Sequence, residues 1–159
     1  MQNMLDYIIG QKKDKHIVLG VAFDWGKRKG LDVFIHLAKV LDTQKYQIVL
    51  IGTDDAIDKK LPENIVSVHR TQNQEELAGY YSYADVFVIP TREDNYPTVN
   101  LEALACGTPV ITFDTGGSPE MLDQGTGVVV PIDDTARLIK EIVEVCERRK
   151  CEDKAYIVD

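Results

Sequence analysis

The feature that most constrains this chain is a repeated alternation of short apolar runs with segments of helical period. Short, continuously apolar runs are typical of strands buried on both faces, and their alternation with helices favours a parallel sheet covered on both sides. The predicted strands are residues 16–23, 46–52, 65–69, 85–91, 109–114 and 127–131. The predicted helices are residues 31–41, 54–61, 73–84, 97–106 and 118–123, with a long final helix that starts at residue 133.

About six such units predict an α/β fold with a doubly wound, Rossmann-like parallel sheet, and 3-2-1-4-5-6 is the expected strand order. In sheets of this kind, ligands bind beyond the carboxyl ends of the strands, where the strand order reverses. That switch point lies between the first and fourth strands. We therefore expect the loops at residues 24–30 and 91–97 to face each other.

Length and composition predict one globular domain without nucleic acid as a partner. The chain has 159 residues and a net charge of −8, whereas phosphate backbones favour a basic face. Its three cysteines, an odd number, are typical of a reducing compartment, so we expect a cytoplasmic protein. We assign residues 1–15 to a lead-in or linker with a short helical turn at 4–9, residues 16–150 to the domain, and residues 151–159 to a polar tail.

The first loop at the switch point is basic. Lys27, Arg28 and Lys29 precede Gly30 and a predicted helix start. Cationic side chains combined with the free amides of a helix N-terminus favour an anion site. An isolated basic triplet is more often a solvated loop, but its place at the switch point favours the anion site. Walker-type and G-x-G-x-x-G patterns are both absent from the sequence, so neither of those phosphate loops is predicted.

The second loop, residues 93–107, is acidic and leads into a helix at Pro97, a residue suited to the first helical position. Glu93 and Asp94 can accept hydrogen bonds from neutral hydroxyls. Glu102 has apolar neighbours, where a carboxylate is costly unless something hydrogen-bonds it. Its partner is either a Lys or Arg within the chain or a ligand such as a vicinal diol.

Other candidate site residues carry weaker signals. Arg70 follows the third predicted strand and is placed to border a nucleotide base, whereas His16, His36 and His69 are isolated and interpreted as structural. The loop at residues 116–120 precedes a predicted helix and offers amides to a ligand, although a plain helix start explains it as well. The sequence contains no Asp-x-Asp pair of the kind that holds a metal against a diphosphate, so we expect no metal.

Three segments together resemble a known family: DVFVIPT at 85–91, EDNYPTVNLEALACGTPVI at 93–111 and TGGSPE at 115–120. They resemble the C-terminal domain of group 1 retaining glycosyltransferases of the GT-B fold, most closely the bacterial capsule and lipopolysaccharide branch. The resemblance implies one half of a two-domain enzyme. Its C-terminal half binds a sugar nucleotide, expected here to be UDP- or GDP-linked, and its N-terminal half binds the acceptor. It implies no further cofactor.

The resemblance also implies roles for individual residues. Glu102 matches the Glu that holds the ribose hydroxyls. Asp94 matches the acidic residue eight positions earlier, although a shift of one residue would put Glu93 there, so the contact with the donor sugar stays open between the two. Lys29 matches the phosphate-binding Lys. The family's usual Arg before that Lys is Asp24 here, and Arg28 is the candidate substitute. The loop residues that would offer backbone N–H groups to sugar and phosphate are Asn95, Tyr96, Pro97 and Thr98.

These observations predict the donor-binding domain of a retaining, metal-independent glycosyltransferase that transfers a sugar to a polysaccharide or lipid-linked acceptor. The chain alone is expected to be an inactive donor half that lacks its N-terminal acceptor domain. Peripheral contact with the inner face of a membrane is expected only through that missing half. The alternative is a non-catalytic donor-binding module completed by a separate acceptor-domain subunit. A sugar-nucleotide epimerase also remains open, while the basic loop argues against a receiver-type signalling domain.

Overall fold

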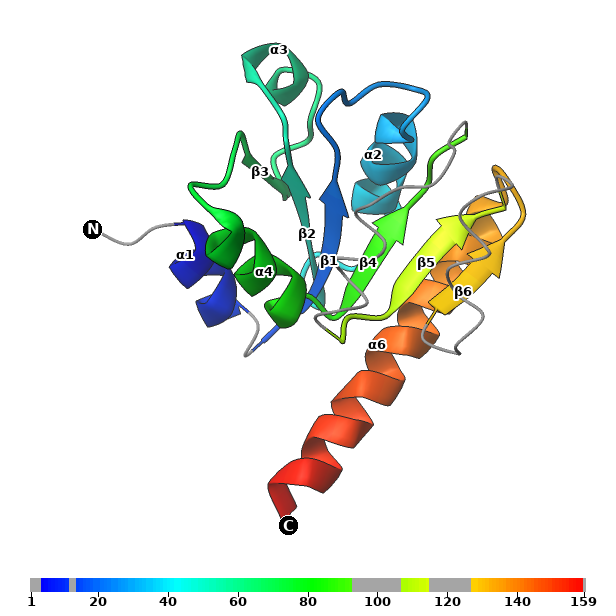
Figure 1. Ribbon diagram of the computed structural model, residues 1–159. Helices are drawn as coiled ribbons and strands as arrows, with labels where there is room; N and C mark the ends of the chain where they lie inside the picture. The colour runs from blue at the N-terminus through cyan, green and yellow to red at the C-terminus, as the bar shows by residue number, and fades with distance from the viewer. Residues whose placement is uncertain (1–3, 12–13, 93–106, 115–126, 159) are drawn as a thin grey trace.

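The strands form one parallel sheet in the predicted order. The computed structural model describes residues 4–11, 14–92, 107–114 and 127–158. Six strands lie in the order β3-β2-β1-β4-β5-β6, and every pairing is parallel (Figure 1). This confirms the α/β fold class and the strand order. The strands are His16–Val21 (β1), Tyr46–Ile51 (β2), Ile65–Val68 (β3), Val86–Ile89 (β4), Val110–Phe113 (β5) and Gly127–Val130 (β6).

The middle strands are buried on both faces, which explains why their sequences are continuously apolar rather than alternating. All four residues of β4 and of β5 are buried, as are all residues of β1 and β2 except the first of each strand. The register pairs Val18 of β1 with Ile48 of β2 and with Val86 of β4. The first and fourth strands are therefore direct neighbours, and the switch point lies between them.

Helices cover both faces of the sheet. Helices α1 and α4 lie on one face, and α2 and α6 lie on the other (Figure 1). Each face has its own apolar core, one that includes Phe34 of α2 and Leu138 of α6, and one that includes Ile8 of α1 and Tyr80 of α4. The helix bounds are Met4–Gln11 (α1), Leu31–Val40 (α2), Asp55–Asp58 (α3), Gln74–Tyr83 (α4) and Thr135–Val158 (α6).

Side-chain caps fix several helix starts. The side chain of Asn73 accepts a hydrogen bond from the Glu76 amide at 2.8 Å and so begins α4. At α6 the Asp134 carboxylate accepts from the Arg137 amide at 3.0 Å, so Asp134 rather than Asp133 supplies the cap. Asp133 instead has a left-handed backbone, with φ of 64°, which turns the chain into α6.

Both ends of the chain contain more helix than the sequence analysis predicted. Residues 4–11 form a full helix whose Ile8 is completely buried, where only a short turn was expected. Helix α6 continues to Val158, although residues beyond 148 showed no clear pattern. Conversely, α3 spans four residues, where a helix over 54–61 was predicted. The predicted helices at 97–106 and 118–123 lie outside the described residues. Within the described part of the chain, no helix combines the length and apolar character needed to cross a membrane.

Candidate functional site

The loops that follow β1 and β4 meet at the edge of the sheet where the parallel strands end. The Arg92 amide donates a hydrogen bond to the Arg28 carbonyl at 2.8 Å, and the Thr91 hydroxyl donates to the same carbonyl at 3.3 Å. The predicted meeting of the two loops is thus confirmed for the part of the second loop that the structure describes, residues 91–92.

The basic loop forms a tight turn at the start of α2; residues 27–30 are called the basic turn below. The Gly30 amide donates to the Lys27 carbonyl at 3.1 Å, and the Leu31 amide donates to the Gly26 carbonyl at 3.0 Å. Gly30 has φ of 84°, and a Cβ on it would overlap the Pro90 carbonyl and ring. This position therefore requires glycine. The turn places the basic residues directly beside the N-terminus of a ten-residue helix.

Trp25 anchors the loop that leads into this turn. Its indole N–H donates to the Ile51 carbonyl at the end of β2, at 3.0 Å. Its ring packs edge-on against Phe34 of α2, with ring centroids 5.5 Å apart. Because the ring is buried and its polar atom is satisfied, Trp25 joins the loop to both a strand and a helix. The sequence analysis did not identify this residue, whose hydrogen-bond partner Ile51 lies 26 residues away.

Asp24 pairs with Arg28 on the exposed side of the basic turn. Arg28 Nη2 lies 2.6 Å from Asp24 Oδ2, and the two side chains are 54% and 59% exposed. An exposed pair of this kind contributes little to stability. Its consequence is geometric, because Asp24 holds the guanidinium of Arg28 at the turn. Arg28, the predicted substitute for the family's Arg, therefore contacts Asp24, which occupies the position of that Arg in this chain.

Arg92 connects three segments around the basic turn, and the sequence analysis missed it. Its guanidinium forms a fork on the Asp32 carboxylate, with Nη1–Oδ1 and Nη2–Oδ2 distances of 2.7 and 2.9 Å. Nε donates to Asp133 at 2.7 Å, and Nη1 donates to the Lys27 carbonyl at 2.6 Å. The hydrogen bonds from Arg92, together with its charge and that of Lys27, lower the pKa of Asp32 against the opposing effect of burial. Both partners of the fork are therefore charged at neutral pH.

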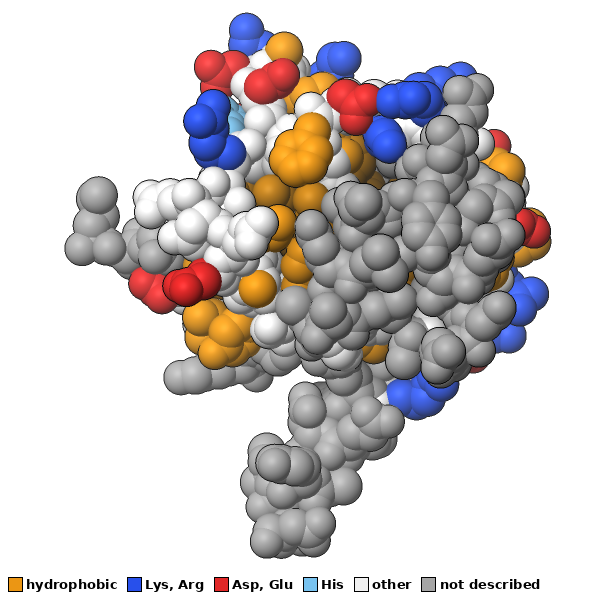
Figure 2. Space-filling model, in the orientation of Figure 1, with side chains coloured by type: hydrophobic (Ala, Val, Ile, Leu, Met, Phe, Trp, Pro, Cys, Tyr) orange, Lys and Arg blue, Asp and Glu red, His pale blue; other side chains and the backbone are white. Residues whose placement is uncertain are grey.

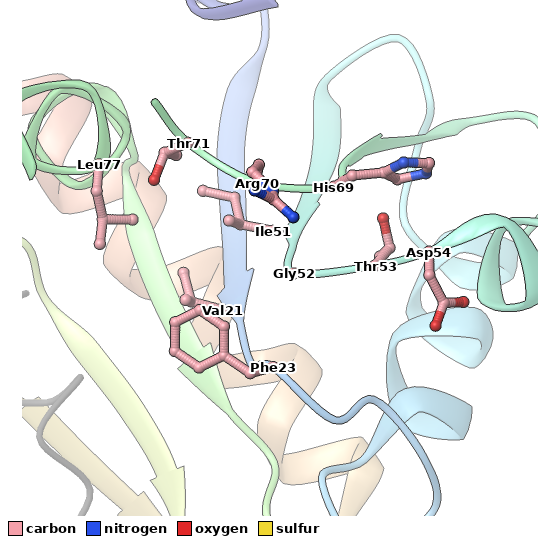
Figure 3. Close-up of a pocket in the computed structure, with 10 residues that line it drawn as sticks. All are labelled: Val21, Phe23, Ile51, Gly52, Thr53, Asp54, His69, Arg70, Thr71 and Leu77. Atoms are coloured by element: carbon pink, nitrogen blue, oxygen red, sulfur yellow. The ribbon is translucent and has the colours of Figure 1, made fainter. Parts of the chain in front are cut away.

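A cavity of about 390 Å³ opens at the ends of β1, β2 and β3 (Figure 3). Its volume lies in the range of small-molecule sites, and apolar side chains form much of its lining. Phe23, which follows β1, is 82% exposed, whereas Arg70 follows β3 and reaches the cavity from another strand. The lining residues are Val21, Phe23, Ile51, Gly52, Thr53, Asp54, His69, Arg70, Thr71 and Leu77.

Gly52, which lines this cavity, allows two backbone segments to pass close to each other. It has φ of 94°, and a Cβ on it would overlap the Ala22 carbonyl. The backbones that follow β1 and β2 can therefore run close together only because residue 52 has no side chain. Phe23 and Thr53, which follow these two close positions in the sequence, both line the cavity.

An ion pair lies at the cavity rim. His69 Nε2 is 2.7 Å from Asp58 Oδ2 and 3.9 Å from Asp55 Oδ1. The hydrogen bond with Asp58 raises the pKa of His69, so the imidazolium form is favoured. Among the described residues these three side chains are the group with metal-ligand spacing, but Asp55 is 95% exposed and His69 already pairs with Asp58. We therefore interpret the group as an ion pair.

The basic turn and the cavity lie at the two ends of one loop, residues 22–30. Phe23 near the start of this loop lines the cavity, and Arg28 and Lys29 near its end belong to the turn. Lysine and arginine side chains gather along the edge where the strands end, interspersed with acidic ones (Figure 2). Of the predicted site residues, Arg28 and Lys29 lie at the switch point and Arg70 lies at the cavity. The others lie outside the described residues, and their roles stay predictions: Glu93, Asp94, Asn95, Tyr96, Pro97, Thr98 and Glu102.

Comparison with known proteins adds independent evidence. Residues 14–148 match the family model described as "Glycosyl transferases group 1". The chain is 32% identical over 133 residues to an "uncharacterized 41.2 kDa protein in cps region" from Klebsiella pneumoniae, covering 82% of this chain and 36% of that protein. It is 42% identical over 116 residues to a D-inositol 3-phosphate glycosyltransferase from Arthrobacter sp. (strain FB24), covering 64% of this chain and 28% of that enzyme.

A solved structure shares the fold. The chain aligns with WaaG, a glycosyltransferase involved in lipopolysaccharide biosynthesis, with a TM-score of 0.70 and 23% identity. The alignment covers 92% of this chain and 43% of WaaG. The chain spans about a third of the length of the curated relatives described above, 36% and 28% respectively.

Proposed function

The chain belongs to the group 1 glycosyltransferases, and on that premise we propose that it binds the nucleoside diphosphate sugar of a retaining, metal-independent transferase. The observation that carries this proposal is the arrangement around loop 22–30. A cavity of about 390 Å³ lies at one end of the loop and a basic turn lies at the other. A nucleoside diphosphate sugar has the matching shape, with a flat base at one end and a doubly charged diphosphate further along.

The basic turn is the proposed site of the diphosphate. Arg28 and Lys29 supply positive charge, and the N-terminus of α2 adds its partial positive charge. Arginine can bind two phosphate oxygens at once, whereas lysine acts as a point charge. These groups would stabilise the charge that builds on the departing nucleoside diphosphate, which is an electrostatic form of catalysis. In this proposal the basic residues supply the charge that a metal ion supplies in other transferases.

The cavity is the proposed site of the nucleoside. Its apolar lining from Val21, Ile51 and Leu77 suits a base, and the exposed ring of Phe23 can stack on one. Arg70 borders the same space, which supports its proposed place beside the base. The resemblance assigns the ribose hydroxyls to Glu102 and the sugar to Asp94 or Glu93, and those assignments are part of the proposal.

The acceptor is proposed to bind outside this chain, because the aligned region covers only 36% and 28% of the length of two relatives. One relative lies in a cps region and a structural neighbour acts in lipopolysaccharide biosynthesis. We accordingly propose a polysaccharide or lipid-linked acceptor. The chain alone is expected to bind donor and to turn over little or none of it.

Titration calorimetry tests the proposal directly. UDP, GDP and ADP would each be titrated into the folded chain, followed by the matching nucleosides. We expect at least one nucleoside diphosphate to bind, and to bind more tightly than its nucleoside. A folded sample that binds none of the three diphosphates would overturn the proposal.

A further inference from the structure

Arg92 lies at the centre of a hydrogen-bond network that surrounds the basic turn without belonging to it. Its partners come from three separate segments: Lys27 in the turn, Asp32 in the first turn of α2, and Asp133 just before α6. In sequence these partners are 65, 60 and 41 residues away from Arg92. One side chain therefore joins the end of β4 to the turn, to the helix that follows it, and to the segment between β6 and α6.

The donors of Arg92 are almost fully used within the chain. A guanidinium has about five N–H donors in a fixed planar fork. Nε uses one on Asp133, Nη1 uses two on Asp32 and the Lys27 carbonyl, and Nη2 uses one on Asp32. The side chain is only 19% exposed, and two carboxylates compensate its single positive charge. Arg92 thus has little charge and little donor capacity to offer an anion.

The main chain of Arg92 strengthens the same connection. Its amide donates to the Arg28 carbonyl at 2.8 Å, so carbonyls of two consecutive residues of the basic turn accept hydrogen bonds from Arg92. These two bonds fix the orientation of the peptide units on either side of Arg28. The direction in which the Arg28 and Lys29 side chains leave the backbone depends on those peptide units.

We propose that Arg92 is a positioning residue, which holds the basic turn in the shape that meets a diphosphate and does not itself bind the phosphates. The inference rests on the function proposed above and extends it from the residues that touch the anion to the one that arranges them. Asp32 and Asp133 act in this account as parts of the same support, because they fix the position and orientation of the guanidinium.

The two carboxylates allow positioning to be separated from simple electrostatics. Asp32→Asn and Asp133→Asn each remove a negative charge near the proposed anion site. If charge alone mattered, both changes would tighten the binding of a diphosphate. If the shape of the turn matters, both changes weaken it. Asp133→Asn is well suited to this comparison, since asparagine tolerates the left-handed backbone found at residue 133.

The experiment measures the affinities of the wild type, Asp32→Asn, Asp133→Asn and Arg92→Lys for UDP, GDP and ADP and for their nucleosides. We expect all three variants to bind the preferred diphosphate about tenfold more weakly, and its nucleoside with less than about a twofold change. Arg92→Lys keeps the charge but cannot form the fork, so it belongs with the two Asn variants. Glu63→Gln is the control, because it removes one exposed charge just before β3, at the end of the sheet where the strands begin.

Diphosphate binding that is unchanged or tighter in the folded Asn variants would overturn the positioning role, as would wild-type affinity in Arg92→Lys. Near-ultraviolet circular dichroism identifies any variant that does not fold, and the remaining variants then decide the question. A wild-type chain that binds no diphosphate contradicts the proposed function and this inference together. A wild type that binds, with variants that bind equally well, contradicts this inference alone.

Discussion

Gly30 carries a constraint that no other residue type can meet. Its φ of 84° lies in the left-handed region, and any side chain would be driven into Pro90 at the end of β4. The basic turn can approach β4 closely only because residue 30 has no side chain to meet Pro90. A residue without a side chain thus determines how near the first loop lies to the second.

Gly30→Ala should lower the free energy of unfolding by about 2–4 kcal/mol, because the added methyl group combines backbone strain with a steric overlap. Gly26→Ala is the matched control in the same loop, since a Cβ at Gly26 meets nothing within 4 Å. Urea unfolding of both variants gives the comparison, and the control should change stability by less than about 1 kcal/mol. Equal effects from the two substitutions would contradict the packing that the structure shows at Gly30.

His69 provides a prediction about pH. Its folded pKa is raised above the usual 6.5 by the hydrogen bond to Asp58 and by the charges of Asp58, Asp55 and Asp54. The stabilisation from this pair is therefore full below pH ~6.5 and is lost as the pH rises through the folded pKa. Asp58 stays ionised over this range because hydrogen bonds, led by the one from His69, outweigh its burial and lower its pKa.

The thermal midpoint of the wild type should exceed that of His69→Gln at about pH 5.5, and the difference should shrink towards about pH 8.5. The effect should be small, because the His69 side chain is 49% exposed. Scanning calorimetry at both pH values gives the two differences. A difference that stays constant or grows with pH would show that the imidazolium form is not what stabilises the pair.

At the scale of the elements, the strands could be predicted, whereas the full extent of the terminal helices could not. Continuous apolar runs such as β4 are buried by any sheet covered on both faces, so the sequence alone identifies them. Helix α1 has only eight residues and depends on tertiary contact. Leu5 packs where Gly79 of α4 leaves room, and Ile8 enters the core. The local sequence pattern of residues 4–11 does not show that α4 packs beside them.

Ile8→Ala tests whether α1 is an integral part of the domain. Ile8 is completely buried in the core on the α4 face, so its truncation should cost about 2–4 kcal/mol of unfolding free energy. Met4→Ala on the same helix is the control, because Met4 is 41% exposed and should change stability by less than about 1 kcal/mol. Chemical denaturation measures both. A change at Ile8 no larger than that at Met4 would mean that α1 does not pack on α4 in solution.

At the scale of the whole molecule, the meeting of the two switch-point loops could be predicted and the side chains that support it could not. The strand order places the switch point between β1 and β4, and the basic residues 27–29 lie beside it as expected. Arg92 was missed because its partners Asp32 and Asp133 are 60 and 41 residues away. The acidic loop at 93–102 was the strongest sequence signal, and it lies outside the described residues.

The central claim is that the basic turn and the cavity together bind a nucleoside diphosphate, the turn meeting its phosphates and the cavity its nucleoside. The most direct test is the ratio of diphosphate to nucleoside affinity in the wild type, in Lys29→Ala and in Lys45→Ala. Lys45 is the control position, because it lies just before β2, at the end of the sheet where the strands begin. We predict that Lys29→Ala weakens diphosphate binding about tenfold or more and changes nucleoside binding by less than about a factor of two. We predict that Lys45→Ala changes neither affinity. Equal losses for diphosphate and nucleoside in Lys29→Ala, or no loss of either, would contradict the account.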